Sequence, residues 1–598
     1  MILLFGGTTE GRRAAEVLEE AGSAFYYSTK TGEQDITLHH GIPIHGAMDE
    51  AAMQRFCREH DIHLIVDAAH PFAQQLHTTV AAMRLPVIRY ERIYPPRDES
   101  IIWIDSYEDL RKLKPCTILA TTGVQSILRL KPLEQEGFRI LYRILPRESS
   151  IRLAHLQGAT DDQLCFYHEG EDEVEVLQKL RPDILLVKES GESGGFTQKT
   201  EAARSLDITI AALKRPPTPS HFHYVNGPHG LRRKVEQLLP DFFPLHSGLT
   251  TGTCATAASV AAALRLLRGE TPAEVPVILP DGETITVPVQ YGDDYAYVIK
   301  DAGDDPDVTD GIEIHSSTKP SELFSIEAGE GIGTITLPGF DYPPGSPAIN
   351  RVPREMIVNN LKTITAGFDI LPLSGGDGGG LGDFSVTLSV PNGAEIARRT
   401  FNPRLGIEGG ISIIGVSGIT KPFSEEAFVN SIRKCMTVAQ AQAPSTVVLN
   451  SGAKSEVFVK ARFPYLPAPC FVQYGNYIGE SLRIAAQLQI SHVTLGVMLG
   501  KAVKLAAGNL DTHSRRTTMD LDFIASMLVE AGCDADTIVQ ARRLTLAREL
   551  WTLLPSDRLE PFAQVVIAHC HRHCDPLLPD GTLDILLIDE EGSIFSRT

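Results

Sequence analysis

Short aliphatic runs alternate with amphipathic stretches of helical spacing over about the first 240 residues. ILLF at residues 2–5 precedes a predicted helix from about Glu10 to Ala21, and IHLIVDA follows the helical run EAAMQRFCREH. Further aliphatic runs occur in PVIRY, TILATTG and DILLVKES. This alternation predicts an α/β fold with Rossmann-like parallel sheets flanked by helices.

The pattern changes at PDFFPLHSG, where two prolines interrupt the alternation. We place a domain boundary there, with one domain over residues 1–243 and a second over 246–598. Beyond it, strands such as ETITVPVQ mix with glycine-rich loops, and LSGGDGGGLGDF is predicted to be a loop before the strand FSVTLSV. Helices are predicted near residues 353–362, 424–441, 497–508 and 518–531. This mixture predicts an α+β fold for the C-terminal half.

The composition and charge of the chain disfavour several classes of function. The 598 residues are 43% hydrophobic and 22% charged, as in globular domains, and the formal net charge of -20 disfavours nucleic-acid and anionic-membrane partners. Nine scattered cysteines indicate reduced thiols and a cytoplasmic protein, and MILLFGG resembles neither a signal peptide nor a membrane span. A homo-oligomer is compatible with these features.

The turn GGTTEGRR follows the first predicted strand. Gly6 and Gly7 permit a sharp turn, and Thr8 and Thr9 can cap the helix that begins near Glu10. The free N–H groups of such a helix start can bind a cofactor phosphate, so Gly6, Gly7, Thr8, Thr9 and Glu10 are candidates for cofactor binding. The turn lacks the G-x-G-x-x-G fingerprint, so an ordinary strand-to-helix turn is the alternative.

Two further segments of this half are candidates for cofactor binding. The second predicted strand ends in hydroxyl and lysine side chains rather than an acidic residue, which favours the 2′-phosphate of NADPH over a bare ribose. These residues are Ser28, Thr29 and Lys30. The loop KESGESGGFTQK is rich in hydrogen-bond donors, and its candidate residues are Lys188, Ser190, Gly194 and Gly195. A solvated loop is the alternative.

The motifs GGTTEGR, DAAHPFA, TTG at 121–123 and KESGESGGF resemble, in this order, the precorrin-6A reductase family over about residues 1–240. This chain has Ala69 where the family has threonine in DATHPFA. The resemblance implies hydride transfer from NADPH to cobalt-precorrin-6A, with a proton reaching the neighbouring carbon and no metal ligands. Asp67 and His70 are the candidate catalytic residues, although a histidine past a buried strand is often structural.

The macrocycle of such a substrate carries many carboxylates, which arginine pairs with bidentately. His70, Arg89 and Arg92 are therefore candidate substrate anchors. Ordinary surface charges are the alternative for the two arginines.

The C-terminal half contains two candidate sites for a methyl donor and a proton. TTGTCATAA places hydroxyls and a glycine at a helix start that can hold a carboxylate, and these residues are Thr250, Thr251, Gly252 and Thr253. The acidic run KDAGDDPDVTDG includes Asp304 and Asp305, which could favour a sulfonium or move protons. A solvated turn is the alternative because the run lacks the EF-hand order of ligands.

Glycine-rich and basic segments supply further candidates in this half. Backbone N–H groups at Gly409 and Gly410 could contact a ligand. Cationic and amide side chains could bind acetate and propionate arms. They are Arg354, Asn402, Arg404, Lys501, Lys504, His513 and Arg515. A cationic helix end that complements its dipole is the alternative for the lysine cluster.

The ordered motifs TTGTCATAA, KDAGDDPDVT, PAINRVPREMI, FNPRLGIEGGISI and GKAVKLAAGNLDTHSR are similar to the cobalt-precorrin-5B C1-methyltransferase family over nearly all of residues 246–598. Val497 and Met498 replace a Gly-His pair typical of that family. The resemblance implies transfer of a methyl group from S-adenosylmethionine to ring carbon C-1, in a fold distinct from Rossmann methyltransferases. The segment HCHRHC at 569–574 has metal-ligand residue types, but no metal site is expected because its spacing does not favour a closed tetrahedron.

The two resemblances concern consecutive reactions, because one family makes cobalt-precorrin-6A and the other consumes it. We therefore predict a bifunctional enzyme of corrin biosynthesis that acts on a tetrapyrrole. One alternative is an NADP-dependent oxidoreductase whose C-terminal half is a non-catalytic binding or oligomerisation module. A second alternative is a non-catalytic tetrapyrrole carrier.

Overall fold

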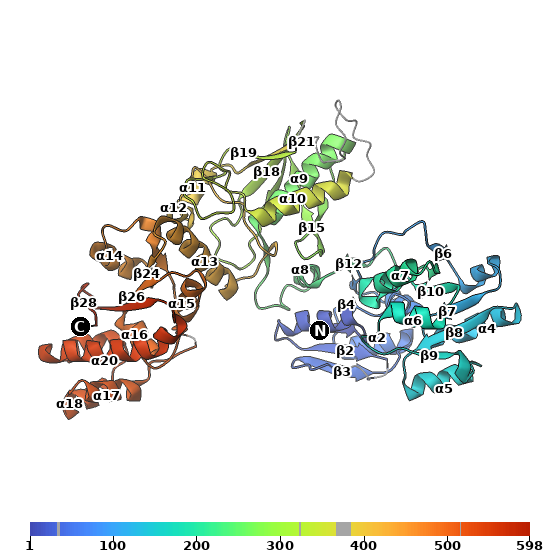
Figure 1. Cartoon of the computed structure of the whole chain (residues 1–598), viewed down its shortest axis with the longest axis horizontal. Coiled ribbons are helices and arrows are strands. Elements are labelled where there is room, and N and C mark those ends of the chain that lie inside the picture. Colours follow the sequence, from blue (N-terminus) through green and yellow to red (C-terminus); the bar gives the residue numbers. More distant parts are fainter. Residues whose placement is uncertain (31, 33–35, 322–323, 366–383, 515, 598) are drawn as a thin grey trace. The chain divides into compact units, whose positions relative to one another are not determined.

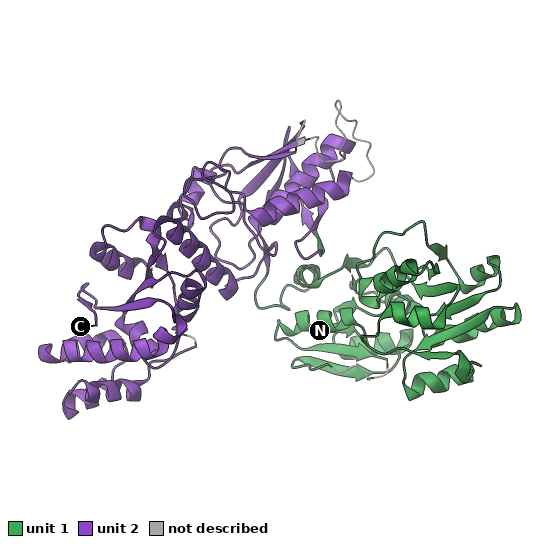
Figure 2. Ribbon diagram, in the orientation of Figure 1, with its two compact units in different colours: residues 1–246, 283–285 green, residues 247–282, 286–598 purple. Residues whose placement is uncertain are grey.

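The computed structural model describes all residues except 31, 33–35, 322–323, 366–383, 515 and 598. The chain divides into two compact units (Figure 2): unit 1 contains residues 1–246 and 283–285, and unit 2 contains residues 247–282 and 286–598. Nearly all of the low-complexity segment at 373–384 lies outside the described residues. Among the helices that the structure describes, none combines the length and the apolar character that a membrane span requires.

Unit 1 contains two six-stranded sheets, and all of their strands pair in parallel. The strands of the first sheet are β1 (Ile2–Phe5), β2 (Phe25–Thr29), β3 (Gly41–His45), β4 (Leu64–Asp67), β5 (Val87–Tyr90) and β12 (His223–Val225). Those of the second sheet are β6 (Ile102–Ile104), β7 (Thr117–Ala120), β8 (Arg139–Ile144), β9 (Leu164–Phe166), β10 (Ile184–Lys188) and β11 (Thr209–Leu213). The predicted α/β architecture of the N-terminal half is confirmed.

The two sheets exchange strands. Their orders are β12-β5-β4-β1-β2-β3 and β6-β11-β10-β7-β8-β9. Strand β6 follows β5 in the chain but pairs with β11, whereas β12 returns to pair with β5 (Figure 1). The strand order reverses between β1 and β4 in one sheet and between β7 and β10 in the other. Open α/β sheets bind ligands at such points, outside the carboxyl ends of the strands.

Helices cover both faces of each sheet of unit 1. They are α1 (Thr9–Glu19), α2 (Glu50–Glu59), α3 (Gln74–Ala81), α4 (Ile127–Gln135), α5 (Glu148–Leu156), α6 (Glu173–Leu180), α7 (Phe196–Ser205) and α8 (Pro228–Leu238). In the first sheet, Leu4 packs with residues of α1 and α8, and its neighbour Leu3 packs with residues of α2 and α3 on the other face. Strands that are covered on both faces consist of continuous aliphatic residues, which explains the short aliphatic runs in the N-terminal sequence.

Unit 2 mixes parallel and antiparallel strands, as the α+β prediction requires. Its strands are β13 (Gly248–Leu249), β14 (Glu274–Ile278), β15 (Thr284–Pro288, of which residues 284–285 are assigned to unit 1), β16 (Gln290–Tyr291), β17 (Ala296–Ile299), β18 (Glu313–Pro320), β19 (Ser325–Ala328), β20 (Thr334–Ile335), β21 (Phe384–Ser389), β22 (Ile407–Glu408), β23 (Ile419–Thr420), β24 (Thr446–Asn450), β25 (Phe471–Gln473), β26 (His492–Met498), β27 (Thr582–Ile588) and β28 (Ile594–Phe595). One five-stranded sheet has the order β16-β17-β18-β21-β19, and the other has the order β25-β24-β26-β27-β28. The second sheet is parallel except for its edge strand β28.

The helices of unit 2 are α9 (Thr251–Arg268), α10 (Arg351–Thr365), α11 (Gly393–Ala397), α12 (Asn402–Leu405), α13 (Glu425–Gln442), α14 (Ala453–Arg462), α15 (Ile478–Gln487), α16 (Leu499–Ala506), α17 (Leu521–Glu530), α18 (Ala535–Ala541), α19 (Leu550–Leu553) and α20 (Ser556–Cys574). The four helices whose positions were predicted in this half are present as α10, α13, α16 and α17, and each of their ends lies within three residues of the predicted one. The helix predicted from 497 begins at Leu499, because Val497 and Met498 pair with β27 as the end of β26. The HCHRHC segment ends α20, where Cys570 and Cys574 pack in the hydrophobic core.

Helix α9 is buried along most of its length, since every residue from 251 to 264 is buried. It packs against α10 and against strands β17 and β18. The many alanines allow this close approach, and Ser259 meets Ser316 of β18 through a 3.0 Å contact between hydroxyl oxygens. The alanine-rich sequence is therefore a packing requirement of this helix.

Substitution Ala258→Leu should lower the free energy of unfolding of unit 2 by about 1–3 kcal/mol, because added methyl groups strain a closely packed core. Ala258 is fully buried. Chemical denaturation measures the change. Ala535→Leu is the matched control, because Ala535 is exposed at the start of α18. Equal stability of the Ala258→Leu variant and the wild type would contradict this account of α9.

Candidate functional site

The carboxyl ends of the two sheets of unit 1 meet at a cavity of about 340 Å³. Its wall comes from the loop after β4, the loop after β7, the end of β10 and the start of α7. The lining residues are His70, Thr121, Thr122, Gly123, Val187, Lys188, Ser190, Gly194, Phe196 and Lys199. Within the described part of the chain, this wall carries two lysines and no carboxylate. The cavity therefore favours an anionic ligand.

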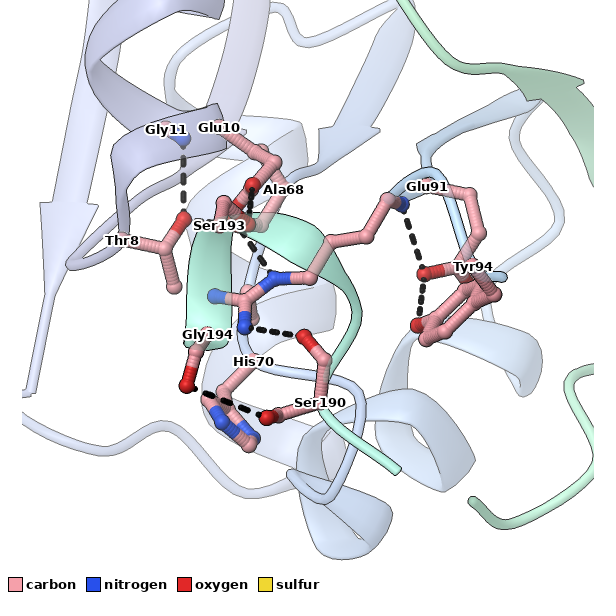
Figure 3. A network of polar contacts seen from close by, with 12 residues as sticks. Thr8, Glu10, Gly11, Ala68, His70, Glu91, Tyr94, Ser190, Ser193 and Gly194 are labelled. Atoms are coloured by element: carbon pink, nitrogen blue, oxygen red, sulfur yellow. Dashed lines mark hydrogen bonds and ion pairs between the residues drawn. The ribbon is translucent and has the colours of Figure 1, made fainter. Parts of the chain in front are cut away.

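A buried ion pair connects the loops that surround this cavity (Figure 3). Arg92 Nε lies 3.0 Å from Glu10 Oε2, and Arg92 also donates to the carbonyl of Ser190 at 2.8 Å. The Ser193 hydroxyl donates to the other carboxylate oxygen of Glu10. Glu10 and Arg92 are 4% and 9% exposed. The predicted roles of Glu10 in cofactor binding and of Arg92 as a substrate anchor are therefore not supported, because each charge is already satisfied inside the protein.

A second buried network lies at the ends of β4 and β5. Asp67 contacts His77 Nδ1 at 2.7 Å and Arg89 at 3.0 Å, and Arg89 also donates to Glu91 at 3.2 Å. Asp67 and Arg89 are both 0% exposed. Burial alone would raise the pKa of Asp67, but the hydrogen bond from His77 and the charge of Arg89 hold it below its ordinary value. Asp67 as a catalytic residue and Arg89 as a substrate anchor are corrected accordingly, since neither side chain reaches the cavity.

His70, in contrast, lines the cavity. Its Nδ1 accepts a hydrogen bond from the N–H of Phe72 at 3.2 Å, so the neutral ring carries its proton on Nε2. Burial, together with the charges of Arg92 and Lys188, lowers the pKa of His70 to about 3. His70 is therefore a neutral imidazole at physiological pH.

The two lysines of the cavity differ in their contacts. Lys188 Nζ lies 5.0 Å from the ring centroid of Phe72, and burial together with the charge of Arg129 lowers its pKa to about 8. Lys199 Nζ donates to the carbonyl of Gly194 at 3.4 Å, and burial lowers its pKa too. Lys199 ends the segment KESGESGGFTQK but was not among the predicted residues; it lies inside α7 rather than in the loop before it.

The turn after β1 depends on its glycines. A Cβ on Gly6 would lie 2.3 Å from the ring of Tyr27, and Gly7 has a φ of +86° that disfavours other residues. Thr8 caps α1 by accepting from the N–H of Gly11 at 2.9 Å. Thr9 is the first residue of α1. The turn therefore has the tight strand-to-helix geometry that the sequence predicts.

The end of β2 lies beside this turn, since the N–H of Gly6 donates to the carbonyl of Ser28 at 2.9 Å. Thr29 Oγ1 lies 3.0 Å from Nδ1 of His45, and Lys30 is exposed. Ser28 and Thr29 are buried. Of the three predicted residues, Lys30 is the one whose charge faces solvent.

In unit 2 the helix start at TTGT is filled by another segment of the chain. The N–H of Gly252 donates to the carbonyl of Ile414 at 2.9 Å, and the Thr253 hydroxyl donates to the carbonyl of Gly418 at 2.6 Å. Thr251 also donates to Ile414, while the Thr250 hydroxyl accepts from the N–H of Thr253. The predicted ligand-binding role of residues 250–253 is not supported, because these polar groups bond within unit 2.

Gly410 and Asn402 likewise belong to the internal packing of this region. A Cβ on Gly410 would lie 2.2 Å from the carbonyl oxygen of Gly331, and Asn402 donates to the carbonyl of Gly410 at 2.9 Å. Gly409 is exposed and has a φ of +80°. Asn402 is buried, and its predicted contact with substrate is not supported.

The remaining candidates of unit 2 come from several segments of the chain. Asp305 accepts from the N–H of Phe423 at 3.0 Å, while Asp304 is exposed. Several basic candidates contact groups of the protein: Arg354 Nε with the carbonyl of Ile349 at 2.8 Å, Arg404 with Glu456 at 2.7 Å, Lys501 with the carbonyl of Gly475, Lys504 with the carbonyl of Thr512 at 3.4 Å, and the N–H of His513 with Asp511 at 3.0 Å. Arg515 lies outside the described residues.

Three family models match the chain. Residues 1–230 match precorrin-6x reductase CbiJ/CobK, residues 241–422 match CbiD, and residues 511–598 match the C-terminal domain of CbiD. A cobalt-precorrin-5B C(1)-methyltransferase of Prosthecochloris aestuarii is 39% identical over 362 residues, which cover 58% of this chain and 95% of that protein. One of Methylococcus capsulatus is 40% identical over 363 residues, with 58% and 91% covered.

Two solved structures are similar to separate parts of the chain. The cobalamin biosynthesis protein CbiD of Archaeoglobus fulgidus is 28% identical, with 46% of this chain and 83% of that chain covered and a TM-score of 0.26. The CobK precorrin-6A reductase is 19% identical, with 40% and 96% covered and a TM-score of 0.34.

Substitution Asp67→Asn should lower the free energy of unfolding of unit 1 by about 1.5–3 kcal/mol at neutral pH, because it removes one of the two carboxylates that pair with the buried Arg89. The pKa of Asp67 is lower in the folded chain than in the unfolded one. Its stabilisation is therefore complete above the unfolded pKa, about 4, and is lost as the pH falls through the folded value.

Chemical denaturation at a series of pH values measures the loss of stability at pH 7 and the change of stability with pH. The stability of the variant should fall less than that of the wild type as the pH is lowered. Asp241→Asn is the matched control, since Asp241 is exposed in the same unit. An unchanged stability of Asp67→Asn at pH 7 would contradict the buried network.

Proposed function

Because the chain belongs to the family of cobalt-precorrin-5B C(1)-methyltransferases and its first 230 residues match precorrin-6x reductases, we propose that it is a bifunctional enzyme of cobalamin biosynthesis. Unit 2 methylates C-1 of cobalt-precorrin-5B with S-adenosylmethionine. Unit 1 then reduces the product, cobalt-precorrin-6A, with NADPH. The observation that carries the reductase assignment is the cationic cavity where the carboxyl ends of two parallel sheets meet.

The residues of unit 1 fit a phosphorylated nucleotide at the first sheet. Gly7 lies at the strand-order reversal, the N–H groups of Thr9 and Glu10 begin α1, and Lys30 directly follows the neighbouring strand β2. Ser28 and Thr29 at the end of β2, together with Lys30, suit a 2′-phosphate. NADPH, when bound, supplies a hydride. The protein's contribution is to hold the acceptor carbon of the macrocycle against it.

The cavity of unit 1 suits a carboxylate-bearing edge of the macrocycle. Lys188 and Lys199 supply positive charge, and the neutral His70 can donate a hydrogen bond from Nε2. Ser190 and Gly194 line the same cavity, and Gly195 precedes α7 with a φ of +69°. In this proposal the loop residues Lys188, Ser190, Gly194 and Gly195, which the sequence predicted for cofactor binding, serve substrate positioning instead.

In unit 2, S-adenosylmethionine supplies the methyl group, and transfer to carbon requires alignment of donor and acceptor. Lys501, Lys504 and His513 are candidates for the carboxylate arms of the macrocycle. Asp304 and Asp305 are candidates for contact with the sulfonium or a proton, and exposed Gly409 for contact with the donor. The tetrapyrrole is the only partner that the proposal requires, and the enzyme acts in the cytoplasm.

Incubation of the full-length chain with cobalt-precorrin-5B, methyl-labelled S-adenosylmethionine and NADPH tests both activities. We expect one labelled methyl group and one oxidised NADPH for each macrocycle converted. Without S-adenosylmethionine, cobalt-precorrin-5B should cause no NADPH oxidation, whereas cobalt-precorrin-6A should. Absence of label transfer would favour a non-catalytic C-terminal module.

Gly7→Val separates the two activities within one chain. The β-branched residue disfavours the positive φ of Gly7, so we expect the KM for NADPH to rise about tenfold or more while methyl transfer stays at the wild-type rate. Initial-rate kinetics measure both values. A parallel loss of methyl transfer would argue against separate sites.

A further inference from the structure

We propose that Lys188 donates the proton that completes the reduction, an inference that rests on the reductase function proposed for unit 1. The macrocycle gains a hydride, with its electron pair, from the C4–H bond of NADPH, which leaves as NADP⁺. The neighbouring atom of the reduced double bond then forms a bond to a proton from Lys188 Nζ. The neutral amine regains a proton from solvent, so that charge and electrons balance.

Lys188 has the position that this step requires. It is the last residue of β10, next to the strand-order reversal with β7, and it lines the cavity together with His70. Its Nζ lies 5.0 Å from the ring centroid of Phe72. Among the residues that the structure describes, Lys188 Nζ has neither a carboxylate partner nor a hydrogen-bond acceptor. A partly buried ammonium group in this state is available to a bound ligand.

The other proton-bearing groups of the cavity wall either are held in hydrogen bonds within the protein or are too weakly acidic to donate this proton. The hydroxyls of Thr121 and Ser190 donate to the carbonyls of Leu186 and Gly194 at 3.1 and 3.3 Å. Lys199 Nζ is held by the same Gly194 carbonyl at 3.4 Å. Hydroxyl groups are also much weaker acids than an ammonium group. Lys188 is therefore the better placed of the two lysines.

His70 does not compete for this role. Its Nδ1 accepts from the N–H of Phe72, and its remaining proton on Nε2 belongs to a neutral ring. A neutral imidazole is a very weak acid, so it can orient the substrate by a hydrogen bond but cannot release this proton near neutral pH. Thr122 is engaged too, since its hydroxyl lies 2.7 Å from that of Ser126.

The charges around Lys188 support proton release near neutral pH. Arg129 on α4 acts on Lys188 through its charge, Lys188 acts on His70 in the same way, and His70 and Lys199 line the same cavity as Lys188. Burial and the charge of Arg129 lower the pKa of Lys188 to about 8. General acids work best with a pKa close to the operating pH. Because the protonated form is required, kcat/KM should fall as the pH rises through about 8.

Lys188→Arg is the decisive variant, because arginine keeps the positive charge but does not release a proton at accessible pH. With cobalt-precorrin-6A and NADPH, we expect kcat of the full-length enzyme to fall about 100-fold or more, while both KM values change by about threefold or less. The fall of kcat/KM above pH 8 should disappear from the residual activity. Lys188→Met should lose kcat similarly and also bind the macrocycle more weakly.

Lys199→Met is the matched comparison, since it removes the other lysine of the same cavity. It should raise the KM for the macrocycle, keep kcat within about threefold and retain the fall above pH 8. The proposal is overturned if Lys188→Arg keeps wild-type kcat and the alkaline fall, or if Lys199→Met loses them instead. NADPH oxidation by the wild-type enzyme with cobalt-precorrin-6A is measured first. If the wild type does not oxidise NADPH, the reductase function itself is rejected. If both the wild type and the Lys188→Arg variant oxidise it, only the role of Lys188 is rejected.

Discussion

The buried ion pair between Glu10 and Arg92 lies at the first sheet of unit 1, and its hydrogen bonds with Ser190 and Ser193 join it to the loop after β10 of the second sheet. Removing two charges from water is costly, so such a pair is tolerated where further hydrogen bonds satisfy both groups. The Ser193 hydroxyl and the Ser190 carbonyl provide them. Together with the exchanged strands β6 and β12, this network keeps the carboxyl ends of both sheets around the same cavity. The positions of His70 and Lys188 relative to each other depend on it.

The internal ion pairs of unit 1 also determine which cationic side chains can contact a ligand. The buried arginines of unit 1 are neutralised by internal carboxylates, as Arg89 is by Asp67 and Arg92 is by Glu10. The cavity lysines have no such partner among the described residues. A chain with a formal net charge of -20 can thus present a local positive site. The charge that an anionic ligand meets in this cavity therefore depends on local pairing rather than on the net charge.

Much of the fold could be predicted from the sequence because strands buried on both faces form continuous aliphatic runs. The strand exchange could not, since β6 and β12 are three-residue strands whose partners are distant in the chain. The ion pairs and hydrogen bonds near the candidate site could not be predicted either, because they also join residues that are distant in the chain. Asp67 and Arg89 are direct neighbours in the register of β4 and β5, so they neutralise each other, but their sequence separation gives no sign of it. The TTGT helix start looks open in the sequence, yet a segment about 160 residues further on fills it.

Lys188, at the end of β10, and Lys501, in α16 shortly after β26, have similar surroundings but suit different chemistry. Lys501 follows β26 as Lys188 ends β10, and burial lowers the pKa of each to about 8. Lys501, however, is held by the carbonyl of Gly475, and the charge of Lys504 contributes to its shift. A methyl group that moves from sulfur to carbon brings no enzyme proton into the product, so a lysine tied to a carbonyl suits a fixed positive charge. A reduction must add a proton as well as a hydride, and the lysine without an acceptor lies in the reductase unit.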